Sequence, residues 1–130
     1  MTNILNTFHD SELNEIKHDR TLSKVFLSFT NEDGSIAKII FEGVCGLRLI
    51  DYGMQNVVSR LLTSQQANER EEINFNVTWI NETSEGKCLI DKYAVENLVD
   101  KIEKGELLLF ILEPSWGAEM RLLARAFSVT

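Results

Sequence analysis

Apolar and polar residues alternate over the first third of the chain, as they do in strands that bury one face. Two such runs, 22–30 and 35–42, flank the turn sequence Asn31-Glu32-Asp33-Gly34, and Asp-Gly readily supplies the positive φ angles of a hairpin. A shorter mixed run, 13–19, comes before them. A further alternating run, 47–51, follows a bend that two glycines bracket. The pattern therefore predicts four strands before residue 52.

The spacing of apolar residues changes after this point. Over 54–62 they recur at intervals of three and four, which predicts a helix with one buried stripe formed by Met54, Val57, Val58, Leu61 and Leu62. The polar stretch 63–72 predicts a loop. Strict alternation returns over 73–79, where Ile73, Phe75, Val77 and Trp79 share one face. We interpret this segment as a fifth strand.

The last third of the chain predicts a second helix and two more strands. The helix begins near Asp91, a good N-cap residue, and ends at Gly105, which takes the left-handed conformation without a Cβ penalty. Six consecutive apolar residues over 107–112 predict a strand covered on both faces, near the centre of a sheet. A turn over 113–118 and a closing strand over 119–129 complete the pattern.

The predicted order is β-β-β-β-α-β-α-β-β. Strands joined by short hairpins imply an antiparallel sheet, here of about seven strands, with two helices covering one face. We therefore predict an α+β fold. A chain of 130 residues suits a single domain spanning 1–130, and no repeat or Pro-rich linker divides it.

Charge narrows the classes of partner. The chain carries 13 Lys and Arg against 20 Asp and Glu, a formal net charge of -7. This balance argues against a nucleic-acid binder and against an anionic membrane surface, since both need clustered cations. It suits a basic protein partner.

We expect no membrane-spanning helix, because no run of about 18 apolar residues occurs, and no signal peptide, because residues 1–15 lack a basic start and an apolar core. We expect a cytoplasmic protein.

Cysteine usage predicts no metal centre. Cys45 and Cys88 are too few for a four-ligand zinc site, and no CxxC motif is present. We expect two small buried thiols, because a disulfide between them would be unusual in a reducing cytosol. We expect no cofactor.

Catalytic motifs are scarce. The pairs His9-Asp10 and His18-Asp19 suggest a metal-dependent hydrolase of the HD type, in which His9, Asp10 and Glu12 would be the ligands. Adjacent residues of an extended segment point to opposite faces, however, so a polar turn or edge-strand histidine is the favoured interpretation. Neither a nucleophile elbow nor a Gly-rich phosphate loop is present, and Ser115 lies in a turn context.

Two aromatic residues are candidate anchors for a partner. Trp116 lies in the turn sequence Pro-Ser-Trp-Gly, and Tyr52 lies just before the predicted helix over 54–62. Exposed aromatic side chains often anchor interfaces, although Trp116 could instead fold back onto the core. Asp33 and Glu119 are candidate acidic residues at the rim. Near Tyr52, Arg48 and Asp51 suggest a polar edge beside Asn56, whose amide could satisfy backbone groups.

Three segments of the chain resemble a group of small bacterial proteins of uncharacterised function. They are FHDSEL at 8–13, FEGVCGLRLIDYGMQNVVSRLL at 41–62 and LEPSWGAEMRLLARAFSV at 112–129. Such proteins are similar to the immunity proteins encoded beside contact-dependent or polymorphic toxins, which are small, cytoplasmic and frequently acidic. The resemblance implies a stoichiometric inhibitor of a toxin domain and assigns no binding residue.

The favoured interpretation is therefore a non-catalytic binding protein. The resemblance implies that it is an immunity protein with a basic toxin, such as a nuclease, as its partner. The metal-dependent hydrolase is one alternative. The other is a self-associating structural domain, in which an edge strand such as 13–19 pairs with its copy in a homodimer.

Overall fold

The computed structural model describes residues 7–64 and 69–130, which form an α+β domain with eight strands and two helices. All strand pairs are antiparallel, and the sheet order is β4-β7-β6-β5-β1-β2-β3-β8. The strands are β1 (Glu12–Asp19), β2 (Lys24–Thr30), β3 (Ile36–Glu42), β4 (Gly46–Ile50), β5 (Val57–Thr63), β6 (Leu108–Trp116), β7 (Glu119–Ala124) and β8 (Ala126–Val129). The helices are α2 (Arg70–Ile80) and α3 (Lys92–Glu103). The α+β class and the antiparallel sheet are as predicted.

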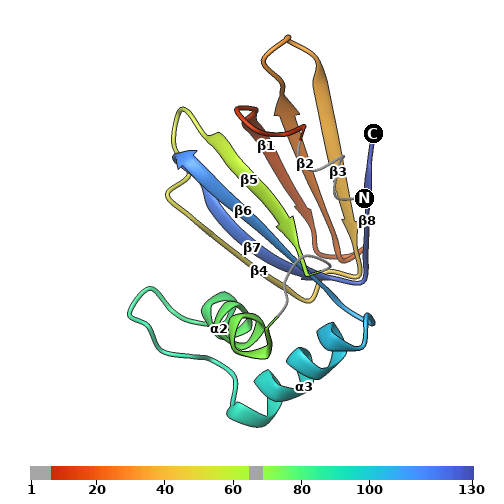
Figure 1. The fold of residues 1–130 in the computed structure, drawn as a ribbon, viewed down its shortest axis with the longest axis vertical. Coiled ribbons are helices and arrows are strands. Elements are labelled where there is room, and N and C mark those ends of the chain that lie inside the picture. Colours follow the sequence, from red (N-terminus) through yellow and green to blue (C-terminus); the bar gives the residue numbers. More distant parts are fainter. Residues whose placement is uncertain (1–6, 65–68) are drawn as a thin grey trace.

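The sheet folds over so that its two halves face each other (Figure 1). β1, β2, β3 and β8 form one layer, and β4, β5, β6 and β7 form the other. The main core fills the space between the layers and includes Leu27, Phe41, Phe110 and Leu122, all fully buried. The rings of Phe41 and Phe110 meet edge to face with centroids 4.7 Å apart, which is a favoured aromatic geometry across the two layers.

Both helices cover the outer face of the second layer (Figure 1). Their apolar stripes enclose a second core with the outward-facing residues of β6 and β7, among them Leu109, Ile111 and Leu123. Because Phe110 and Leu112 face the first core, β6 is buried on both faces, as its apolar sequence predicts. α3 starts at the predicted cap, where the Asp91 carboxylate accepts a hydrogen bond from the Ala94 N–H at 2.8 Å.

The predicted helix over 54–62 is wrong, because this segment contains β5. The pairing of β5 with β6 is irregular at Val57–Val58 and again between Val58 and Arg60. A bulge adds a residue to one strand and leaves the next side chains out of phase. Val58 and Leu61 therefore face the same core despite their spacing of three, which imitates a helical period.

The predicted strand over 73–79 is also wrong, because it lies in α2. Ile73, Val77 and Ile80 are the buried apolar residues, and their spacing of four and three is that of a helix. Phe75, which completed the apparent alternation, is exposed. One predicted helix is thus a strand and one predicted strand is a helix, which leaves the number of helices unchanged but alters the order of the elements. The observed order is β-β-β-β-β-α-α-β-β-β.

The remaining differences are at the C-terminal end of the chain. β6 continues through the predicted turn to Trp116, so that only Gly117 and Ala118 connect it to β7. The predicted closing strand divides at Arg125 into β7 and β8, which pair in different layers. These changes give eight strands instead of about seven.

β1, the expected edge strand, lies between β5 and β2, although Glu12 and Val57 form its single register pair with β5 among the described residues. Within the described ranges, no helix is long and apolar enough to cross a bilayer.

Candidate interaction surface

Four segments distant in sequence meet at one end of the folded sheet, which we call the hairpin end: 7–12, 31–36, 51–57 and 114–119. Strand register brings them together, since Glu12 lies opposite both Thr30 and Val57. Val57 in turn lies opposite Trp116. The hairpin between β2 and β3 is part of this end (Figure 1). The surface formed here could not be identified from any single segment.

The hairpin end carries four exposed apolar side chains, which are Ile36, Tyr52, Met54 and Trp116. The exposed fractions are 48% for Tyr52, 68% for Trp116 and 105% for Met54, which therefore does not belong to any buried stripe. Trp116 does not fold back onto the core. The Tyr52 hydroxyl donates to the backbone oxygen of Asn14 at 3.3 Å, which links this side chain to β1. Exposed aromatic residues of this kind are enriched at the energetic centres of protein interfaces.

A buried amide holds this surface in shape. The Asn56 Oδ1 accepts from the backbone N–H groups of Gly53 and Ala118, both at 3.0 Å, and its Nδ2 donates to the Gly53 oxygen at 2.9 Å. Asn56 thus satisfies backbone groups, as expected, and joins the 51–57 segment to the β6–β7 turn. Gly117 is required beside it, because a Cβ at this residue would lie 2.4 Å from the Gln55 backbone oxygen.

The hairpin end is strongly acidic. Its four segments contain six carboxylates and no lysine or arginine, the acids being Asp10, Glu12, Glu32, Asp33, Asp51 and Glu119. Two of them are held by neighbours. The Asp33 carboxylate accepts from the Ser35 hydroxyl at 2.6 Å and from the Ser35 N–H at 2.9 Å. Glu119 pairs with Arg121 of β7 at 2.6 Å and is half-buried. All four residues that we considered for partner binding therefore lie at this end.

The residues of the hydrolase alternative also lie at the hairpin end but are engaged separately. The His9 Nδ1 lies 3.1 Å from the Asp10 carboxylate, and both side chains are exposed. The Glu12 carboxylate instead accepts from the Gln55 amide at 3.0 Å. Across the described residues, no group of three or more His, Cys, Asp and Glu side chains is arranged to hold a metal ion.

Arg48 has a structural role that its sequence context did not reveal. Its guanidinium donates to the Trp79 backbone oxygen at 2.8 Å and lies 4.3 Å from the centre of the Trp79 ring. Arg121 lies 4.2 Å from the centre of the same ring, so two cations contact one indole. This cluster fastens α2 to β4 and β7. The assignment of Trp79 to a strand concealed it.

The cysteines differ from the expected buried pair. Cys88 is half-buried, Cys45 is exposed, and both are free thiols. Cys45 lies in the bend between β3 and β4, at the opposite end of the sheet from Trp116.

Comparison with known proteins adds no assignment, since no protein-family model matches the chain and no curated protein matches it. The fold and the surface define an α+β domain with two cores and one acidic, aromatic end.

Proposed function

We propose that this protein is a non-catalytic binding domain whose hairpin end binds a basic protein. Its resemblance to immunity proteins of polymorphic toxins makes a toxin domain the proposed partner, bound in the cytoplasm. The observation that carries this proposal is the coincidence of exposed Tyr52, Met54 and Trp116 with six carboxylates and no lysine or arginine.

Physical reasons support each part of this surface. Tryptophan and tyrosine bury large areas with few rotatable bonds, so they dominate binding energy when a partner covers them. Carboxylates around such anchors attract a basic partner during diffusion and reject an acidic one. The amide of Asn56 fixes the 51–57 segment before binding, which reduces the entropy lost on association.

The proposal predicts that a neighbouring gene encodes a basic toxin domain, and the test is binding to that domain. We expect a one-to-one complex and loss of toxicity when both proteins are present. Trp116→Ala should weaken the complex by about 2 kcal/mol or more, roughly thirtyfold in dissociation constant, measured by calorimetry. Tyr52→Ala should weaken it in the same direction.

Tyr93→Ala is the matched control, since Tyr93 is an exposed aromatic residue at the start of α3, away from the hairpin end. Its affinity should equal that of the native protein. All three variants should keep the native melting temperature, because these side chains are exposed. The proposal is contradicted if the native protein neither binds nor neutralises the toxin. It is also contradicted if Trp116→Ala and Tyr93→Ala lose affinity equally.

A further inference from the structure

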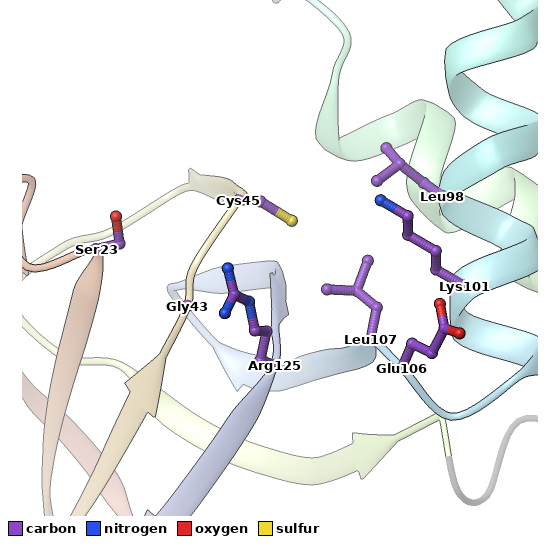
Figure 2. Close-up of a pocket in the computed structure, with 8 residues that line it drawn as sticks. All are labelled: Ser23, Gly43, Cys45, Leu98, Lys101, Glu106, Leu107 and Arg125. Carbon is purple, nitrogen blue, oxygen red and sulfur yellow. The ribbon is translucent and has the colours of Figure 1, made fainter.

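A pocket of about 350 Å³ lies at the end of the sheet opposite the hairpin end. Figure 2 shows Cys45, Lys101 and Arg125 directed into it from three different elements. Cys45 comes from the β3–β4 bend, Lys101 from the last turn of α3, and Arg125 from the break between β7 and β8. Leu98 and Leu107 supply an apolar wall. Its volume is within the range of small-molecule sites, about 300–1,000 Å³.

The walls of this pocket are held rigidly. The Cys45 N–H donates to the Leu123 oxygen, and the Arg125 N–H donates to the Glu42 oxygen, both at 2.9 Å. The Val44 N–H donates to the oxygen of Ser23, a third lining residue, at 2.9 Å. Ser23 has a φ of 52°, a left-handed conformation that is uncommon for serine. The backbone is thus fixed on three sides before any ligand enters.

Arg125 is positioned by a glycine. A Cβ on Gly43 would lie 2.8 Å from the Arg125 Cγ, and Gly43 has a φ of 63°, so a larger residue would displace the arginine. The aliphatic part of Arg125 therefore packs across the bend while its guanidinium faces the pocket (Figure 2).

The two cations of the pocket have no carboxylate partner within ion-pair distance among the described residues. By contrast, Arg60, Arg70 and Arg121 each pair with a carboxylate. Glu106 also lines the pocket, so its side chains carry a net charge of +1 from Lys101, Arg125 and Glu106. In a chain of net charge -7, a cavity with a net positive charge and two cations outside any ion pair can bind an anion.

We propose that this pocket binds a small molecule through a phosphate or carboxylate group held by Arg125 and Lys101. The guanidinium of Arg125 matches the geometry of either oxyanion with two parallel hydrogen bonds, and Lys101 adds a mobile ammonium. The leucine wall accommodates an apolar portion of the ligand, and Glu106 disfavours a second anionic group near its carboxylate.

Cys45 reports on occupancy without being needed for binding. Although Cys45 is exposed at the mouth of the pocket, partial desolvation by the surrounding atoms raises the pKa of its thiol, an effect that the charges of Lys101 and Arg125 partly oppose. It is therefore mostly protonated at neutral pH and reacts slowly but measurably with alkylating reagents. A ligand between the two cations would shield it.

The experiment is alkylation by iodoacetamide, an uncharged reagent, with labelling of each cysteine followed by mass spectrometry. The probes are inorganic phosphate and succinate, each compared with sodium chloride at equal ionic strength. We expect at least one probe, at up to about 20 mM, to slow labelling of Cys45 threefold or more in a saturable manner. Labelling of Cys88 should not change. Protection by phosphate alone identifies a phosphate ligand, protection by succinate alone a carboxylate ligand, and protection by both the shared oxyanion chemistry.

Substitutions complete the test. Arg125→Gln keeps the carbons that pack nearest Gly43 but removes the charge, and Lys101→Gln removes the other cation. Either should weaken protection roughly tenfold in probe concentration. Lys104→Gln, at the end of the same helix but outside the pocket lining, should leave it intact. The proposal is overturned if neither probe protects Cys45, or if protection survives unchanged in both pocket variants. Neither outcome bears on the hairpin end, which the assay does not involve.

Discussion

At the residue scale, the turn between β2 and β3 shows how a carboxylate is stabilised without an ion pair. The side-chain hydrogen bond from Ser35 is the larger cause, and the backbone bond adds to it, holding the pKa of Asp33 below its ordinary 3.8. Because the folded pKa is depressed, this contribution to stability is present above about pH 4 and is lost as the pH falls through the folded pKa. The turn should therefore loosen in acid.

Replacing the hydroxyl tests this cause. Ser35→Ala removes the stronger hydrogen bond and keeps the backbone bond, so the pKa of Asp33 should rise toward 3.8. The measurement is an NMR titration of the Asp33 side-chain carboxyl carbon. Ser35→Thr retains a hydroxyl and should retain most of the depression. An unchanged pKa in Ser35→Ala would show that the backbone bond is sufficient.

At the scale of the elements, prediction from sequence succeeded where a single interaction decides the structure. The β2–β3 hairpin follows from its alternation and its Asp-Gly turn, and α3 follows from its apolar stripe and the Asp91 cap. Prediction failed over 54–80, where the apolar residues fit both the alternation of a strand and the spacing of a helix. The bulges of β5 depend on the register with β6, and that partner lies about fifty residues later in sequence.

The sequence of α2 contains signals of a helix, but the alternation of apolar residues over 73–79 outweighs them. Glu71 and Glu72 in its first turn favour a helix N-terminus, and Ile80 extends the helical spacing of Ile73 and Val77. The exposure of Phe75 could not be foreseen, because it depends on which face of α2 meets the sheet. The same dependence explains why Tyr52 and Trp116 could be proposed separately, whereas their common location required the fold.

The connection of the 51–57 segment to the β6–β7 turn rests on Asn56, which is 4% exposed. Asn56→Ala would leave the N–H groups of Gly53 and Ala118 without this acceptor, so we expect a loss of about 2–4 kcal/mol in free energy of unfolding. Chemical denaturation would measure it. Gln55→Ala removes a neighbouring but exposed amide and should change stability by less than about 0.5 kcal/mol. Equal effects would mean that burial of the amide is unimportant.

At the scale of the whole molecule, the charge of -7 is unevenly placed along the sheet. Although acids are spread along the sequence, the hairpin end gathers six of them without a lysine or arginine. The segments 20–24, 42–45, 104–107 and 124–126 at the opposite end contain Arg20, Lys24, Lys104 and Arg125 against Glu42 and Glu106. Charge is therefore uneven along the strands of the sheet, although the helical region 69–106 is also acidic, with ten Asp and Glu against five Lys and Arg. A basic partner that approaches the sheet would be oriented toward the hairpin end before contact.

This orientation predicts how charge reversal affects the rate of association with a basic partner. Glu32→Lys changes an exposed acid of the hairpin end, and Glu85→Lys makes the same change in the connection between α2 and α3 (Figure 1). At low salt, Glu32→Lys should slow association about threefold to tenfold, because steering acts before the surfaces touch. Glu85→Lys should slow it much less. At about 0.5 M salt the two rates should converge, because screening then acts within about 5 Å. Stopped-flow mixing would measure these rates, and equal effects of the two substitutions at low salt would place the partner elsewhere on the protein.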